Sequence, residues 1–201
     1  MLHQPAIEEQ TFSLLRHLQS LPFLSDFSLA GGTALALKHQ HSISEDLDLF
    51  GDTLDKELIL KELIKEFGTR IEYEILPSEW ALFCYIDKIK VDIVKYDHPL
   101  VKPIKLLNSI RLFSDEDIAA MKVNAILGIG TKKDFWDMFE LLNHFSLSDV
   151  ISFHRIKFPQ QMLLISIPQA LSYFEDAENN RDPISLKNQN WENIKRQFES
   201  T

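Results

Sequence analysis

The residues best suited to chemistry are three aspartates, Asp46, Asp48 and Asp92, each within a segment that has the pattern of a β-strand. Residues 46–49 alternate aspartate and leucine. Because side chains along a strand alternate between its two faces, both carboxylates point to one face, about 7 Å apart, while the leucines enter the core. Carboxylates are ligands that suit Mg²⁺, and three of them can hold two ions, one for nucleotide phosphates and one to activate an attacking hydroxyl. The spacing therefore predicts a magnesium site in which Asp92 is the third acid.

A glycine pair, Gly31-Gly32, comes before this strand and directly precedes residues 33–39, which fit a short helix. The N-terminus of a helix offers unpaired backbone N–H groups, and glycines let a phosphate approach them without a Cβ in the way. Together with Thr33, the pair could hold a triphosphate. An ordinary turn between a strand and a helix explains the glycines equally well by themselves, but the aspartates that follow favour the phosphate site.

The aspartates also have less specific interpretations. Asp46 and Asp48 could lie on a solvated strand face, and Asp92 could be a hairpin residue at a sheet edge. An EF-hand calcium loop is a third alternative, because its ligand and glycine positions are matched by Asp46, Asp48, Gly51 and Glu57. Phe50 at a ligand position disfavours the calcium loop, as does the polar stretch where the entering helix should lie.

Hydrophobic periodicity predicts an α/β half followed by a helical half. Helices are expected over residues 5–19, 33–39 and 53–67, the last capped by Thr53, and strands over 46–49, 71–76, 80–86 and 89–96. A tight turn at Asp87-Lys88 should join the last two strands as a hairpin, and no later strand is expected. Ser114 and Asp117 predict a capping box for a helix that ends near Gly128, followed by helices over 133–144 and 190–198. The expected division is a core over 1–100 and a helical region over 101–201.

Several other groups have two interpretations each. His39 and His41 could bind a metal as an i, i+2 pair, but no third histidine or cysteine lies nearby in the sequence, so His39 is expected to be a solvated loop residue. The acidic run at 174–178 is expected to be a solvated helix end, with a basic partner as the alternative. Aromatic side chains that could stack bases, but whose periodicity favours the core, are Trp80, Phe83, Tyr85, Phe135, Trp136 and Phe139.

Taken in order, the motifs resemble those of the AbiEii/AbiGii toxin family of nucleotidyltransferases, within the DNA polymerase β superfamily. The resemblance runs from residue 29 to about residue 142. The matching blocks are GGTALAL at 31–37, HSISEDLDLF at 41–50, Asp92, Met121-Lys122, and KDFWD at 133–137. Ser42 stands where the family usually has arginine. If that arginine helps to bind phosphate, the serine changes the affinity for the nucleotide or the choice of nucleotide.

The resemblance implies an α+β fold, with a minimal nucleotidyltransferase-like mixed sheet and flanking helices followed by a C-terminal helical region. It implies that Asp46, Asp48 and Asp92 hold two Mg²⁺ ions, and that the nucleotide is bound by Gly31, Gly32, Thr33, Ser44 and Lys133. Lys122 and Asp137 complete the catalytic set, and His41 is expected to orient its loop. Lys133 and Asp137 could instead form a surface ion pair, because they are four residues apart on one helix.

The implied activity is Mg²⁺-dependent transfer of a nucleoside monophosphate from an NTP to an acceptor hydroxyl, on an RNA such as tRNA or on a protein. Such an enzyme would be the toxin of a toxin–antitoxin or phage-defence pair, with a cognate antitoxin as partner. The alternative is a non-catalytic protein that keeps the fold and binds a nucleotide or a partner.

The formal net charge of −9 and the pI of about 5.2 argue against general attraction to nucleic acids or anionic membranes. An RNA acceptor would need a local patch, for which the candidates are Lys88, Lys90, Lys102, Lys105, Lys132 and Lys133. A single cysteine, Cys84, excludes an intrachain disulfide and suits a reducing compartment. Glu8 and Glu9 stand where an export signal would be basic and then apolar, and the uncharged stretch 158–174 contains two prolines. A cytoplasmic protein without a membrane span is therefore expected.

Overall fold

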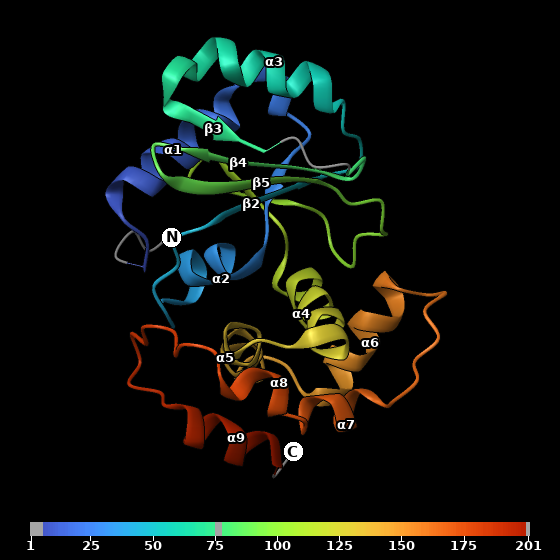
Figure 1. The fold of residues 1–201 in the computed structure, drawn as a ribbon. Helices are drawn as coiled ribbons and strands as arrows, with labels where there is room; N and C mark the ends of the chain where they lie inside the picture. Colours follow the sequence, from blue (N-terminus) through green and yellow to red (C-terminus); the bar gives the residue numbers. More distant parts are fainter. Residues whose placement is uncertain (1–5, 75–77, 200–201) are drawn as a thin grey trace.

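A computed structural model describes residues 6–74 and 78–199, and its centre is a mixed sheet with the strand order β3-β4-β5-β2-β1-β7-β6 (Figure 1). The strands are β1 (Ser28–Leu29), β2 (Leu47–Gly51), β3 (Ile71–Tyr73), β4 (Ala81–Ile86), β5 (Ile89–Lys95), β6 (Lys105–Leu107) and β7 (Ile110–Leu112). The pairs β2–β5 and β1–β7 are parallel, and the other neighbours are antiparallel. The α+β class expected from the sequence is confirmed.

The two central strands, β2 and β5, are amphipathic in the way their sequences predict. Leu47 and Leu49 of β2 and Val91 and Ile93 of β5 are fully buried, while the residues between them are partly exposed. Helices α1 (Glu9–Ser20) and α3 (Lys56–Phe67) cover one face of the sheet, and α2 (Gly31–His39) lies on the other (Figure 1). The alternation therefore places the aspartates of β2 and β5 together on a single face of the sheet.

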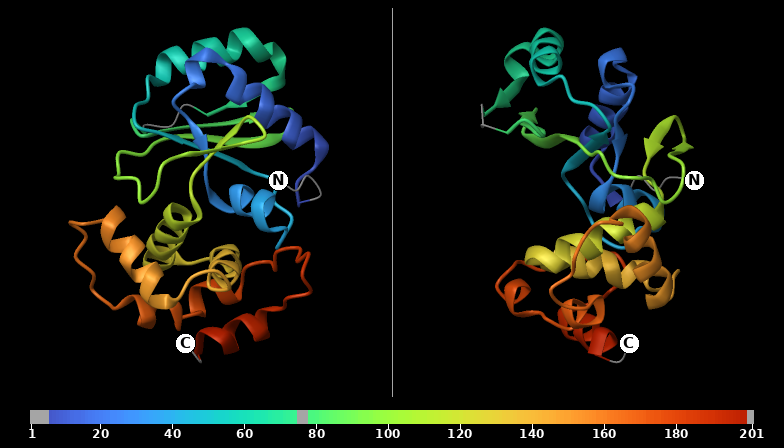
Figure 2. Two further views of the ribbon diagram at one scale, coloured as in Figure 1. Left: turned by 180° about the vertical axis from the view of Figure 1, so that it is seen from behind. Right: turned by 90° about the vertical axis from the view of Figure 1, so that its right-hand side faces the viewer.

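The remaining helices form a layer beyond the face that carries α2, as both views of Figure 2 show. They are α4 (Asp115–Ile129), α5 (Lys132–Leu141), α6 (Leu147–Lys157), α7 (Ile167–Leu171), α8 (Glu175–Glu178) and α9 (Trp191–Glu199). Helices α4 and α5 both contact α2, so the helical region packs directly on the core. None of the helices in the described ranges is long and apolar enough to cross a bilayer.

A buried ion pair ties this layer to the join that leads into it. The Lys157 ammonium of α6 lies 2.7 Å from a carboxylate oxygen of Asp117 in α4, and neither side chain is exposed. The same carboxylate accepts the backbone N–H groups of Val101 and Lys102 at 2.9 and 3.0 Å. The ion pair and the two backbone hydrogen bonds together offset much of the free-energy cost of burying this carboxylate.

The structure corrects several details of the sequence analysis. A second hairpin, β6–β7, is present although no strand was expected after residue 96. Its turn residues Asn108 and Ser109 have positive φ angles of 49° and 64°. Helix α3 is capped by Asp55, which accepts the N–H of Leu58, rather than by Thr53. Helix α4 has the predicted Ser114 cap but continues to Ile129. The predicted strand 71–76 ends at residue 73, and its last two positions, like residue 5, lie outside the described residues.

Candidate active site

Asp48 and Asp92 lie side by side because β2 and β5 are parallel neighbours in which these two residues are register partners. Asp46 stands just before β2, and its side chain is 40% exposed. Burial, followed by the negative charge of Asp92, raises the pKa of Asp48 from 3.8 to about 6, although the nearby Lys122 opposes this rise. A raised carboxyl pKa is the electrostatic signature of acids crowded together at a functional site.

Asp92 belongs to an inner strand, so the interpretation as an edge residue is wrong. Its Oδ2 accepts a hydrogen bond from the Lys90 ammonium at 2.6 Å. Its Oδ1 is buried and has no hydrogen-bond partner among the described residues. A buried oxygen without a partner, facing the same side as a second carboxylate, fits a cation ligand.

The glycine pair is packed against these acids. Gly31 has a φ of +67°, a conformation that favours glycine, and a Cβ placed on it would lie 2.5 Å from Oδ2 of Asp48. A Cβ on Gly32 would lie 3.1 Å from a carboxylate oxygen of Asp137. The turn that begins α2 therefore needs glycine in order to fit between the carboxylates of two different layers.

Thr33 and Ser44 connect the start of α2 to the strand that carries the aspartates. The two hydroxyl oxygens are 2.7 Å apart, and the Thr33 hydroxyl also donates to the backbone carbonyl of Asp46. Thr33 is 1% exposed, whereas Ser44 lines a pocket. Thr33 thus holds the loop before β2 in place, while Ser44, whose hydroxyl donates to Thr33, presents its oxygen to the pocket.

A charged network from the helical region closes the other side of the site. The Lys122 ammonium of α4 lies 2.8 Å from Asp134 and 2.6 Å from Asp137, both of α5. Burial by itself lowers the pKa of Lys122, but the two carboxylates outweigh burial and hold that pKa above its ordinary value. Burial likewise raises the pKa of Asp137, but Lys122 and a hydrogen bond from His41 at 2.7 Å outweigh burial and lower it. Lys122 and Asp137 therefore remain charged at neutral pH.

Lys133 reaches the site from the first turn of α5. Its ammonium lies 3.8 Å from Oδ2 of Asp46, and its side chain is 68% exposed. Asp137 is buried and pairs with Lys122, so the alternative of a surface ion pair between Lys133 and Asp137 is wrong. Lys133 is an exposed positive charge that lines the first pocket next to Asp46.

Two pockets are lined by these aspartates, the first by Asp46 and Asp48 and the second by Asp92. The first is lined on the core side by Gly32, Ser42, Ser44, Asp46 and Asp48 and on the helical side by Lys122, Thr131, Lys133, Asp134, Trp136 and Asp137. The second is lined by Asp92 together with Glu72, Tyr73, Phe83, Tyr85 and Lys90. Most of the site residues expected from the sequence are therefore brought together, whereas Gly31 and Thr33 support the first pocket from behind. The ion pair of Asp134 with Lys122 was not predicted, although the place of Asp134 in the first turn of the helix after the Met-Lys block was a usable signal.

The carboxylate set suits hard divalent cations, for which Asp46, Asp48 and Asp92 would be the ligands. Within the described ranges, these three side chains do not bring one oxygen each to within 4.8 Å of one another.

The other sequence candidates separate into surface and core groups. The segment expected in the EF-hand alternative is strand β2, so that alternative is wrong. Trp80 and Tyr85 are 61% and 48% exposed, while Phe135 and Trp136 are buried as predicted. Lys132 is buried against Asp182 at 2.8 Å and is not available to a surface patch. Burial raises the pKa of the Cys84 thiol to about 12, as expected for a small core residue.

The histidines also differ from expectation. His39 is not solvated: its side chain is 14% exposed, and Nε2 lies 3.0 Å from Asp115. His41 is 1% exposed and contacts Asp137, so the two histidines do not form a metal pair. Ser42, where arginine was expected from the resemblance, lines the first pocket and pairs with Ser185 in an isolated β-bridge.

Comparison with known proteins agrees with this geometry. The family model described as nucleotidyl transferase AbiEii toxin, type IV toxin–antitoxin system, matches residues 13–201. The uncharacterized protein aq_aa25 of Aquifex aeolicus (strain VF5) is 32% identical over 178 residues, which cover 85% of this chain and 84% of that protein. The solved structure of MenT4, a nucleotidyltransferase toxin from Mycobacterium tuberculosis H37Rv, has a TM-score of 0.62 at 17% identity and covers 96% of this chain and 84% of that chain. The antibiotic-resistance factor ANT(2″)-Ia has a TM-score of 0.57 at 13% identity and covers 73% and 91% of the two chains. At these identities, the two solved structures show a shared fold.

Proposed function

The chain belongs to the AbiEii family of nucleotidyltransferase toxins, and from this premise we propose that it moves a nucleoside monophosphate from an NTP to an acceptor hydroxyl with the help of Mg²⁺. The observation that carries the proposal is the register pairing of Asp48 with Asp92 on the sheet face where the glycine turn packs against Asp48. A phosphate bound at this turn would lie next to Asp48, and this supports the proposal.

In this reaction the acceptor oxygen attacks the α-phosphorus, a new P–O bond forms, and the bond to the departing pyrophosphate breaks. The acceptor proton leaves toward the carboxylate of Asp92, the register partner of Asp48. When bound by Asp46, Asp48 and Asp92, Mg²⁺ would neutralise phosphate charge and lower the pKa of the attacking hydroxyl.

The two pockets suggest which side each substrate occupies. The first pocket contains Lys133 and the backbone of Gly32, groups that suit the triphosphate. The second pocket borders Asp92 and carries partly exposed Phe83 and Tyr85, so it suits the acceptor. An in-line attack requires the acceptor hydroxyl and the departing pyrophosphate on opposite sides of the α-phosphorus, and the proposal assigns one pocket to each of these groups.

The acceptor that we propose is a hydroxyl of an RNA such as tRNA, or of a protein, and the biological setting is a toxin with a cognate antitoxin in the cytoplasm. The family supports the toxin role. An RNA would have to be held by the local lysines at the site, such as Lys88, Lys90 and Lys133, because the whole chain carries a net charge of −9.

A label-transfer assay tests the proposal. Purified protein is incubated with Mg²⁺ and each α-³²P-labelled NTP, with total RNA or a cell lysate as acceptor. We expect one NTP to label a discrete acceptor, and Asp48→Asn to abolish labelling. Asp52→Asn is a matched control, because Asp52 is an exposed aspartate close to the same strand and outside both pockets.

The possible outcomes separate the two functional classes. Absence of label with all NTPs and acceptors, combined with NTP binding in calorimetry, would contradict the transferase proposal and favour the non-catalytic alternative. Growth arrest on overexpression that Asp48→Asn removes would support the toxin role, whereas harmless overexpression of an active enzyme would count against it.

A further inference from the structure

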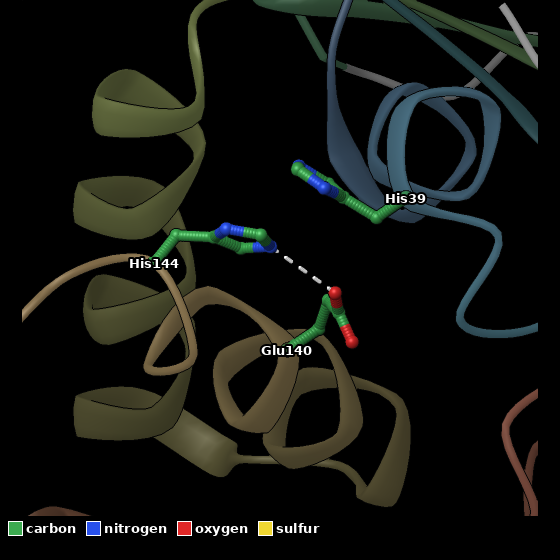
Figure 3. Close-up of side chains that lie close together, drawn as sticks. All are labelled: His39, Glu140 and His144. Atoms are coloured by element: carbon green, nitrogen blue, oxygen red, sulfur yellow. Dashed lines mark hydrogen bonds and ion pairs between the residues drawn. The ribbon is translucent and has the colours of Figure 1, made fainter.

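A cluster of two histidines and a glutamate lies behind the active-site network, where the C-terminal ends of α2 and α5 meet. Figure 3 shows the side chains of His39, Glu140 and His144 close together, the first at the end of α2, the second in the last turn of α5 and the third in the turn that follows α5. One ligand atom of each lies within 4.8 Å of those of the other two, and in the described part of the chain this is the one such group. The site described above uses none of these residues.

The geometry of the two rings suits a shared ion. Their centroids are 4.6 Å apart. Two imidazoles bound to one tetrahedral Zn²⁺ have centroids about 5 Å apart, given the usual Zn–N distance of about 2.0 Å. His144 Nε2 already lies 3.2 Å from Oε1 of Glu140, so small side-chain rotations bring these donors around one point.

His39 has the outer partner that metal-binding histidines usually have. Its Nε2 lies 3.0 Å from Oδ2 of Asp115, and the other oxygen of Asp115 binds the Lys38 ammonium at 2.6 Å. A carboxylate that accepts one ring N–H fixes the tautomer and leaves the other nitrogen free as a ligand. Asp115 therefore orients His39 so that Nδ1 is the available donor.

The surroundings favour a cation. Glu140 is 2% exposed, and its Oε2 is buried without a hydrogen-bond partner among the described residues. Both α2 and α5 end at the cluster, and a helix C-terminus carries a partial negative charge. The competing positive charge is Lys187, whose ammonium lies 2.6 Å from Oε1 of Glu140. Its side chain is 39% exposed, so it can turn outward when an ion arrives.

We propose that His39, Glu140 and His144 form a binding site for a transition-metal ion of the Zn²⁺ class, separate from the magnesium site. Two imidazoles and one carboxylate select such ions over Mg²⁺, which prefers oxygen ligands alone. The side chain of His144 is 44% exposed, which gives the ion an entry path and leaves room for water as a fourth ligand.

The ion would fix the position of two residues next to the first pocket, His41 and Asp137. His39 is two residues before His41, and Glu140 is one helical turn after Asp137. His41 and Asp137 are joined by the 2.7 Å hydrogen bond described above. A metal that links α2 to α5 therefore holds both partners of that hydrogen bond, and its role is positional rather than catalytic.

Metal binding is measured without nucleotide, so the result does not depend on transferase activity. The full-length chain is titrated with Zn²⁺ in calorimetry in the presence of excess Mg²⁺, and with Co²⁺ as a spectroscopic probe. We expect one Zn²⁺ per chain and a Co²⁺ visible band of tetrahedral intensity. His144→Ala, at a partly exposed position, should weaken Zn²⁺ binding about 100-fold and remove the band.

Two further variants make the test specific. His17→Ala is the matched control, because His17 also pairs with a glutamate, Glu66, at 2.8 Å, but on the other side of the core, and this variant should bind Zn²⁺ as the unaltered chain does. Asp48→Asn should also leave the Zn²⁺ stoichiometry unchanged. Equal affinity in His144→Ala and His17→Ala, or loss of the Zn²⁺ in Asp48→Asn, would overturn the proposal.

Discussion

Replacing Asp48 by asparagine should make the fold more stable while it removes activity. The pKa of Asp48 rises from 3.8 to about 6 in the folded chain, first because of burial and then because of the charge on Asp92. Such a rise corresponds to about 3 kcal/mol by which the ionised carboxylate destabilises the folded state at neutral pH. Asparagine has nearly the same shape and no charge, so it is free of this penalty.

The pH dependence gives the sign of the effect. Below the unfolded-state pKa, Asp48 is protonated in both states and no penalty applies. As the pH rises through the folded-state pKa of about 6, the penalty reaches its full value and then stays constant. The stability advantage of Asp48→Asn should therefore grow by about 2 kcal/mol between about pH 4.5 and about pH 7.5.

Urea denaturation of both proteins at several pH values, in EDTA, measures this difference, because the titration of groups that do not interact with Asp48 cancels between the two chains. Added Mg²⁺ should stabilise the unaltered chain and leave Asp48→Asn nearly unchanged. A stability difference that does not vary with pH would show that burial and Asp92 do not raise the pKa of Asp48. The electrostatic account of the site would then fail.

Further substitutions test the glycine turn and the two buried ion pairs. Gly68→Ala should cost about 1 kcal/mol in urea denaturation because of its positive φ angle, with nothing within 4 Å of the added Cβ. Gly31→Ala should cost more and should also abolish label transfer, because its Cβ would lie 2.5 Å from Oδ2 of Asp48. Lys157→Met should lower the free energy of unfolding by about 3 to 5 kcal/mol, because it leaves a buried carboxylate unpaired, and a loss under 1 kcal/mol would contradict this. Lys122→Met should be destabilising for the same reason, and adding Asp137→Asn should restore thermal stability but not activity. If the single and double variants have equal melting temperatures, the ion pair does not couple the two helices.

The sequence predicted the aspartate face correctly because that prediction is local. A period of two in β2 and an acid among apolar residues in β5 determine which side chains share a face of a strand, whatever the strands pair with. The Asp87-Lys88 turn was predictable for the same reason, and both residues have the positive φ angles of a two-residue hairpin turn. The parallel register that joins Asp48 to Asp92 was not predictable, since it depends on strands that are distant along the chain.

The errors occurred where partners are distant along the chain or elements are short. Strands β6 and β7 have three residues each, too few for periodicity to detect, although Asn108-Ser109 was a usable turn signal. His39 was expected in solvent because its partner, Asp115, is 76 residues away. The pairing of Asp137 with Lys122 likewise joins separate helices. Helical spacing alone could suggest only a partner on the same helix, Lys133.

The charge balance of the site leads to an order of binding. The chain is acidic overall, and Asp46, Asp48 and Asp92 add negative charge where a triphosphate must lie. Lys122 is held by Asp134 and Asp137, so it offers little free charge, and exposed Lys133 cannot by itself balance a triphosphate. Divalent ions at the carboxylates reverse the local sign. Nucleotide binding should therefore require the metal, and NTP should bind far more weakly in EDTA than in Mg²⁺.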